Sequence, residues 1–167
     1  ALEGVADVGD CLWGQLLLAD ARSQARYWRG RMAQALEWCG CEENLSANYA
    51  PTLSATLAGL EAFLTASEQG WDAARACLPI PFPTAGRKKI RDCLAEAEQV
   101  KALRNTCKKR MEKLDALFAD TSADLLADMG AVYPAVRGLF ALVADFEAAY
   151  AAEKARRGLV DFSDLEH

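Results

Sequence analysis

The residues of this 167-residue chain that are best suited to binding chemistry are cations gathered in one stretch. Between Arg87 and Lys113 ten basic residues stand against four acidic ones, so this stretch carries +6 while the rest of the chain carries −11. Clustered cations suit a phosphate backbone, which they bind through counterion release without reading base sequence. The sequence therefore predicts a DNA contact, with these candidate residues: Arg87, Lys88, Lys89, Arg91, Lys101, Arg104, Lys108 and Lys109.

The same cations allow a second interpretation, a solvated helix face. Lys101, Arg104 and Lys108 recur at spacings of three and four residues, which places them on one flank of a helix. Glu98 and Glu112 stand at helical spacing from that flank and would neutralise part of it. At the level of sequence both interpretations stay open.

The chain lacks the patterns of an active site. It has no GxxxxGKS/T segment to hold nucleotide phosphates, and its one histidine is His167 at the end of the sequence. Carboxylate pairs such as Glu42 with Glu43 are better explained by solvation or helix capping than by acid–base catalysis. We expect no catalytic residue and no cofactor within this chain.

Six cysteines without a paired spacing predict free thiols instead of a metal site. Structural zinc sites use four Cys or His ligands in short paired spacings such as CxxC, and only Cys39-Gly40-Cys41 comes near that pattern. We therefore expect reduced, mostly buried thiols, no metal ion and a cytoplasmic location. The cysteines stand at positions 11, 39, 41, 77, 93 and 107.

The elements that must position these residues are expected to be helices. Alanine is abundant, β-branched residues are few, and no stretch alternates in the manner of a strand. Three prolines between Pro79 and Pro83 predict a stiff extended connector. Helices are expected over about residues 10–38, 51–69, 71–78, 87–118 and 122–157, the last interrupted between Gly130 and Pro134.

These elements predict an all-α fold, an irregular bundle of long antiparallel helices with no sheet. The longest apolar run, Leu16–Ala19, is too short to cross a membrane, so no membrane partner is expected.

The final residues carry the most specific pattern of the chain. Asp161-Phe162-Ser163-Asp164-Leu165 follows Gly158 and two apolar residues. This order resembles the DFxDL junction motif of superfamily 1A DNA helicases. Its continuation through Glu166 and His167 is similar to the DFxDLEH form of the AddA family, which belongs to the bacterial AddAB helicase–nucleases. The basic segment Lys88-Lys89-Ile90-Arg91-Asp92 also resembles a lysine-rich stretch of that family.

The resemblance implies a piece of a larger motor. Residues 1–158 would be the helical accessory subdomain called 1B, and residues 159–167 the start of the return into motor domain 1A. Four junction residues would hold this subdomain to the motor core: Asp161, Phe162, Asp164 and Leu165.

The resemblance also implies the activity and partners of the parent. It would be a helicase and exonuclease that uses ATP and Mg²⁺, moves 3′–5′, and acts in double-strand-break repair and recombination. Its partners would be duplex and single-stranded DNA, the remaining helicase domains and a second subunit, AddB.

Two alternatives stay open. The parent could be a RecB or UvrD/Rep-type helicase in which the subdomain has the same local role. The chain could also be a non-catalytic helical protein-interaction module, which would expose a large apolar patch and show no salt-dependent DNA binding.

Overall fold

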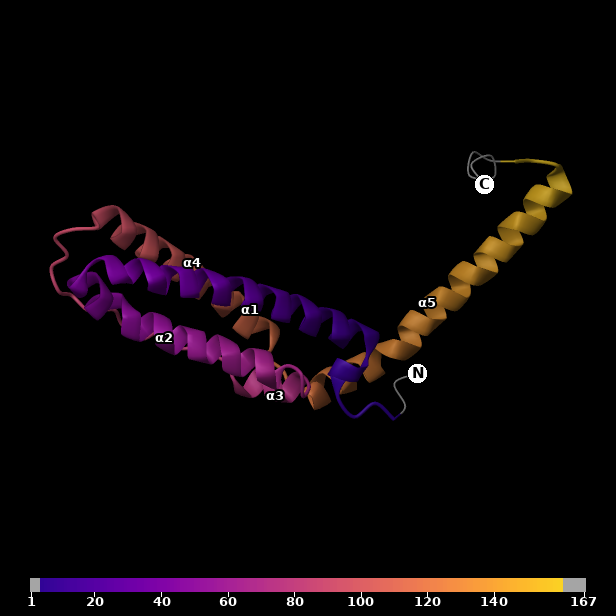
Figure 1. The fold of residues 1–167 in the computed structure, drawn as a ribbon. Coiled ribbons are helices and arrows are strands. Elements are labelled where there is room, and N and C mark those ends of the chain that lie inside the picture. The colour runs from indigo at the N-terminus through magenta and orange to yellow at the C-terminus, as the bar shows by residue number, and fades with distance from the viewer. Residues whose placement is uncertain (1–3, 161–167) are drawn as a thin grey trace. The chain divides into compact units, whose positions relative to one another are not determined.

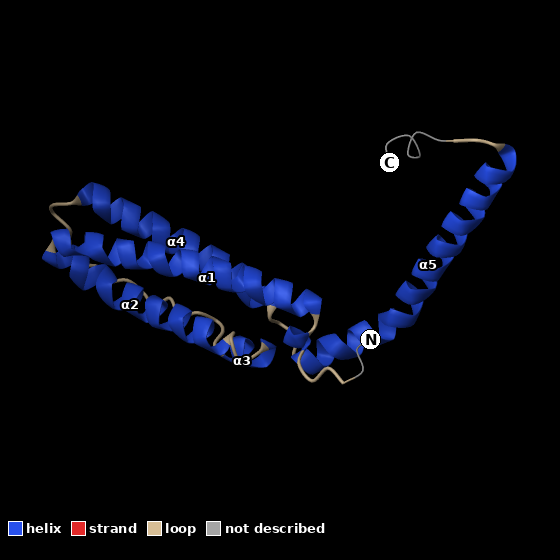
Figure 2. Ribbon diagram, turned by 45° about the vertical axis from the view of Figure 1, so that its right-hand side comes forward, coloured by secondary structure: helices blue, strands red, loops and turns tan. Residues whose placement is uncertain are grey.

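The structure, a computed structural model, describes residues 4–160, and all regular elements in that range are helices (Figures 1 and 2). This confirms the all-α prediction. The elements are η1 (Val8–Asp10), α1 (Leu12–Trp38), η2 (Cys39–Cys41), α2 (Glu43–Ala66), α3 (Trp71–Ala76), α4 (Leu94–Leu117) and α5 (Ser122–Arg157).

The chain divides into two compact units after Leu126. The first unit contains α1 to α4 and the beginning of α5, and the second contains the rest of α5 and the residues after it. The expected boundary at residue 158 between an accessory subdomain and a motor domain stays a prediction.

The core of the first unit forms where α1 packs against α2 and α4 (Figure 1). Alanine recurs on the buried face of α1, so the neighbouring helices approach closely. At one end of the unit Trp71 stacks on Phe118 with ring centroids 4.3 Å apart, and its indole Nε1 donates to the Asp120 carbonyl at 3.0 Å. The fully buried large side chains include Met32, Leu45, Leu53, Leu60, Phe63, Trp71 and Phe118.

The helices α2 and α4 run in the same direction, and each is antiparallel to α1. Cys41, before α2, lies beside Cys93, before α4, while Phe63 near the end of α2 packs on Phe118 just after α4. Two parallel helices need a long crossover connection. Residues 77–93 provide it without any helix or strand, and we call residues 79–92 the strap.

Two predicted helix starts and one predicted interruption are wrong. α2 begins at Glu43 instead of Pro51, and Pro51 lies inside it at an exposed position where water can satisfy the backbone carbonyl that a proline leaves unpaired. α4 begins at Leu94 because residues 87–92 are held extended by α2. α5 continues through Gly130 and Pro134 without interruption.

The start of α5 is capped by two side chains. The hydroxyl of Thr121 accepts from the backbone N–H of Asp124 at 3.2 Å, and the Asp124 carboxylate accepts from the Thr121 hydroxyl at 2.6 Å. These bonds lower the pKa of Asp124. Such reciprocal capping satisfies N–H groups that the first turn of a helix leaves unpaired.

Among the described helices, α5 is long and apolar enough to cross a membrane by length and composition alone. The expectation of no membrane partner rested on uninterrupted apolar runs, whereas α5 tolerates scattered charges such as Arg137 and Asp145. A charge near the centre of a bilayer is costly, and a single helix of this length and composition does not by itself establish a membrane span. The absence of a membrane partner therefore stays a prediction.

Candidate nucleic-acid interface

The backbone of the strap is satisfied by polar side chains on one face of α2. An extended segment without a partner strand must find other partners for its N–H and C=O groups. The Thr56 hydroxyl donates to the Pro81 carbonyl at 2.8 Å, and the Thr52 hydroxyl donates to the Pro83 carbonyl at 2.6 Å. Both threonines are buried, so these bonds fix the proline-rich half of the strap against α2.

Asn48 continues the same face one turn earlier and holds the basic half of the strap. Its side-chain Oδ1 accepts from the Lys88 N–H at 2.8 Å, and its Nδ2 donates to the Lys88 carbonyl at 2.8 Å. The Asn48 carbonyl also accepts from the Gly86 N–H at 2.9 Å. A Cβ on Gly86 would lie 2.5 Å from Asn48 Oδ1, so glycine permits this close approach.

Two further residues near the start of α2 complete the attachment. Asn44 Nδ2 donates to the Lys89 carbonyl at 3.0 Å, and Glu42 Oε1 accepts from the Arg91 N–H at 3.2 Å. Asn44, Asn48, Thr52 and Thr56, which we call the α2 ladder, therefore recur every four residues and grip successive parts of the strap.

The cationic side chains of the strap point away from this attachment into solvent. Arg87, Lys88, Lys89 and Arg91 are all exposed, although the backbone between them is hydrogen-bonded to α2. Where the sequence predicts the start of a helix, the structure has a row of cations on an extended backbone. The helix dipole does not oppose charge placed there, because α4 starts after the row has ended.

Arg104 differs from the other candidate residues because its half-buried guanidinium is hydrogen-bonded to other parts of the protein. Its Nη2 donates to the Pro83 carbonyl at 2.7 Å and to the Phe82 carbonyl at 3.2 Å, and its Nε donates to the Thr52 hydroxyl at 3.2 Å. The guanidinium carbon also lies 5.9 Å from the Phe82 ring centroid. Arg104 therefore joins α4 to the strap and α2, a structural role that the spacing of cations did not indicate.

The remaining α4 candidates are exposed. Lys101 lies 3.6 Å from Glu98 and Lys108 lies 3.9 Å from Glu112, the pairs expected for a solvated helix face. Such exposed pairs contribute little to stability and exchange readily with other ions, so they leave these lysines competent to meet a phosphate. Lys109 is exposed, as are two α4 cations outside the candidate set, Arg110 and Lys113.

The strap ends at a cluster of thiols and carboxylates. Cys93 has a left-handed backbone with φ 53°, and its thiol lies beside Cys41 and Glu96. The hydrogen bond to Cys41, partial burial and neighbouring negative charge raise the pKa of Cys93 to about 11. Burial similarly raises the pKa of Cys39 to about 11, with a further contribution from Cys41.

The C-terminal end of α5 leads toward the predicted junction motif. Gly158, at φ 65°, closes the helix: its N–H donates to the Ala155 carbonyl at 3.3 Å and the Leu159 N–H donates to the Lys154 carbonyl at 3.0 Å. This is the Schellman pattern, which confirms Gly158 as the predicted helix end.

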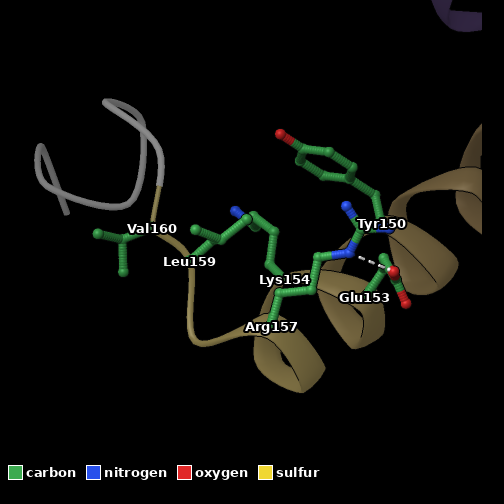
Figure 3. A pocket seen from close by; sticks show the side chains of 6 residues that line it. All are labelled: Tyr150, Glu153, Lys154, Arg157, Leu159 and Val160. Carbon is green, nitrogen blue, oxygen red and sulfur yellow. Dashed lines mark hydrogen bonds and ion pairs between the residues drawn. The ribbon is translucent and has the colours of Figure 1, made fainter.

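The same helix end forms a shallow hollow (Figure 3). Glu153 accepts from Arg156 at 2.7 Å and from Arg157 at 2.5 Å, and these bonds lower the pKa of Glu153. Lys154 Nζ lies 5.0 Å from the Tyr150 ring centroid. The junction residues themselves lie outside the described residues: Asp161, Phe162, Asp164 and Leu165.

Comparison with known proteins identifies relatives over nearly the whole chain. The A subunit of the ATP-dependent helicase/nuclease from Acetivibrio thermocellus is 30% identical over 170 residues, which cover 96% of this chain and 13% of the relative. Its counterpart from Clostridium acetobutylicum is 25% identical over 167 residues, with the same coverage. The chain is homologous to part of AddA, the A subunit of these helicase/nucleases.

The AddA protein of Desulforudis audaxviator is 48% identical over a shorter region of 65 residues, 38% of this chain. These relatives bear out the resemblance to the AddA family, and the chain spans only about 13% of the length of those it matches throughout. No protein-family model and no solved structure matches the chain at a significant level.

Proposed function

We propose that this chain is a DNA-contacting accessory subdomain of an AddAB-type ATP-dependent 3′–5′ DNA helicase and exonuclease. The observation that carries the proposal is the strap, whose backbone is fixed by the α2 ladder while its four cations are exposed. A fixed row of cations loses little conformational freedom when it meets a phosphate backbone, so less of its binding free energy is spent on ordering.

The proposed interface binds the DNA backbone and reads no sequence. The cations of the strap would neutralise successive phosphates and release condensed counterions. Lys101, Lys108 and Lys109 on α4 would extend the contact, whereas Arg104 supports it from within. Binding would position DNA relative to the motor and perform no chemistry.

The rest of the proposed parent supplies the catalysis. ATP and Mg²⁺ would bind to motor domains beyond this chain, and the nuclease would also lie elsewhere. The names of the relatives favour an AddA parent over a RecB or UvrD/Rep-type parent. In this proposal the parent pairs with AddB, acts in the cytoplasm on double-strand breaks for recombinational repair, and uses the junction residues to hold this subdomain to its motor core.

A second candidate function, protein docking, is favoured by the apolar face of α5. Val136, Leu139, Val143, Phe146 and Tyr150 recur at spacings of three and four residues, and all are exposed. Such a stripe is typical of a helix that packs against a partner. Docking of this face and DNA binding by the strap use different residues, so one protein can carry both.

The test is DNA binding by charge-reversed variants, measured by fluorescence anisotropy on a duplex with a 3′ single-stranded tail. Lys88→Glu with Lys89→Glu removes two cations of the strap, and we expect an affinity loss of about tenfold or more at low salt. The matched control is Arg26→Glu with Arg29→Glu, which makes the same charge change at exposed positions of α1.

The control separates a local contact from general electrostatic attraction. We expect the α1 control to retain most of the wild-type affinity. Equal losses in both variants would show that net charge alone drives binding, and an unchanged affinity in the strap variant would overturn the proposed interface.

A further inference from the structure

Two thiols and a carboxylate from separate segments meet where the strap joins α4. The Sγ atoms of Cys41 and Cys93 and a carboxylate oxygen of Glu96 all lie within 4.8 Å of one another. Cys41 ends η2, Cys93 immediately precedes α4, and Glu96 lies in its first turn. The fold therefore brings together three potential metal ligands, the second and third of which are 52 and 55 residues from the first in sequence.

A neighbouring carboxylate gives an independent indication of a ligand. Glu42 is adjacent to Cys41, and its Oε1 is fixed by the Arg91 N–H at 3.2 Å. Its other oxygen, Oε2, is buried and has no hydrogen-bond partner among the described residues. A buried carboxylate oxygen without a partner is costly, and the charge of Glu42 acts on Cys93, so a cation bound at the cluster would offset part of that cost.

We propose that Cys41, Cys93 and Glu96 bind a thiophilic divalent cation of the zinc type, with a solvent molecule as the fourth ligand. Zinc accepts thiolate and carboxylate ligands together and favours four ligands in a tetrahedron. Their exposure differs, since Cys41 is exposed while Cys93 and Glu96 are partly buried, so a cation can enter from solvent. On binding, each thiol that coordinates releases its proton to solvent.

The proposed ion would lock the interface described above. It would join Cys41, just before α2, to the start of α4. The strap ends at this same place. Glu42, which holds the strap backbone through Oε1, would add its negative charge to the surroundings of the ion. The inference concerns this cluster alone and does not depend on whether the strap binds DNA.

The sequence predicts no metal site because the short spacings of zinc motifs are absent. Only Cys39 and Cys41 are close in sequence, whereas the pair that the fold brings together is Cys41 with Cys93. A pattern based on neighbouring cysteines misses ligands that helix packing assembles.

The test uses Co²⁺ as a spectroscopic substitute for Zn²⁺ on the reduced 167-residue chain. Thiolate coordination gives an intense sulfur-to-cobalt charge-transfer band, and we expect one Co²⁺ per chain that Zn²⁺ displaces. Cys41→Ser and Cys93→Asn should each abolish the band. Asparagine is chosen at position 93 because it tolerates the left-handed backbone that Cys93 adopts.

Two further variants make the result decisive. Glu96→Gln should weaken Co²⁺ affinity at least about tenfold while leaving a thiolate band. Cys77→Ser, a thiol outside the cluster, should leave the band unchanged. Circular dichroism of each variant establishes that lost binding is not lost folding.

Several outcomes would overturn the proposal. They are absence of a charge-transfer band in the folded wild type, a band that survives Cys41→Ser or Cys93→Asn, and a band lost in Cys77→Ser. If the reduced wild type gives no Co²⁺ band and air oxidation links Cys41 to Cys93, the pair is assigned to a disulfide instead.

Discussion

Asn48 is the residue on which the order of the strap depends most. It is 4% exposed, and one side chain pairs both backbone polar groups of Lys88. A buried amide so placed cannot be removed without leaving the strap backbone unpaired. The positive charge of the interface and its fixed geometry thus come from different residues, which can be altered separately.

Replacing Asn48 with alanine is predicted to destabilise the protein by about 1–3 kcal/mol, because two part-buried backbone groups lose their partners. DNA affinity should fall as well, although no charge changes, since the strap becomes mobile. Urea denaturation measures the first effect and anisotropy the second, with exchange of the Lys88 amide hydrogen as a local readout. A variant with fast amide exchange and undiminished DNA affinity would show that order in the strap is irrelevant to binding.

The guanidinium of Arg104 is predicted to stabilise the protein through its shape as well as its charge. Arg104→Lys keeps the cation but loses the fork of donors that reaches two carbonyls and a hydroxyl, so we expect a stability loss of about 1.5–3 kcal/mol. Lys101→Arg, an exposed position on the same flank, serves as the control and should change stability little. The interpretation fails if thermal unfolding finds both variants equally stable.

Cys107 is predicted to contribute to the alkaline limit of stability. Burial raises its pKa from 9.0 to about 12, against a smaller opposing effect of Arg104. The folded state therefore holds this proton at a pH where the unfolded state releases it, so its contribution is complete below 9.0 and decreases as pH rises toward 12. Cys107→Ala should flatten the stability loss over that range relative to Cys77→Ala. An unchanged slope would contradict a buried neutral thiol.

Among the elements, the long helices could be predicted from the sequence. Of the strap, only the proline-rich half could be predicted. Periodic apolar residues indicated α1, α4 and α5, because each helix repeats its contacts every turn. The prolines indicated an extended connector but gave no sign of its length. Its basic half has the composition of a helix and is extended because Asn44, Asn48 and Glu42 hold it.

The predicted start of α2 is wrong because, here too, contacts with a segment distant in sequence decide the structure. Asn44 and Asn48 looked like loop residues, yet they lie in α2 with their side chains turned to the strap. Two asparagines and two threonines at four-residue spacing are the sequence signal from which the α2 ladder could have been predicted. Only the fold shows which distant segment such a ladder binds, so Arg104 and the Cys41–Cys93 pair also escaped prediction.

At the scale of the whole molecule, the chain corresponds to about 13% of its full-length relatives, so surfaces exposed here have many possible neighbours there. The apolar stripe of α5 is the clearest such surface. We expect the 167-residue chain to self-associate reversibly at high concentration, because exposed heptad-like stripes pair with one another. Leu139→Lys with Val143→Lys should give a monomer in sedimentation velocity. A wild-type chain that is monomeric at every concentration would contradict pairing of this face with itself.

The central claim is that the strap contacts phosphates, and the salt dependence of DNA affinity tests it most directly. Each phosphate contact contributes about 0.7–0.9 to the slope of log affinity against log salt concentration. Neutralising the strap with Lys88→Gln and Lys89→Gln should therefore reduce the magnitude of the slope by about 1.4–1.8, while Arg26→Gln with Arg29→Gln should leave it unchanged. A slope that is the same in the wild type and the strap variant would show that DNA binds elsewhere or does not bind this chain.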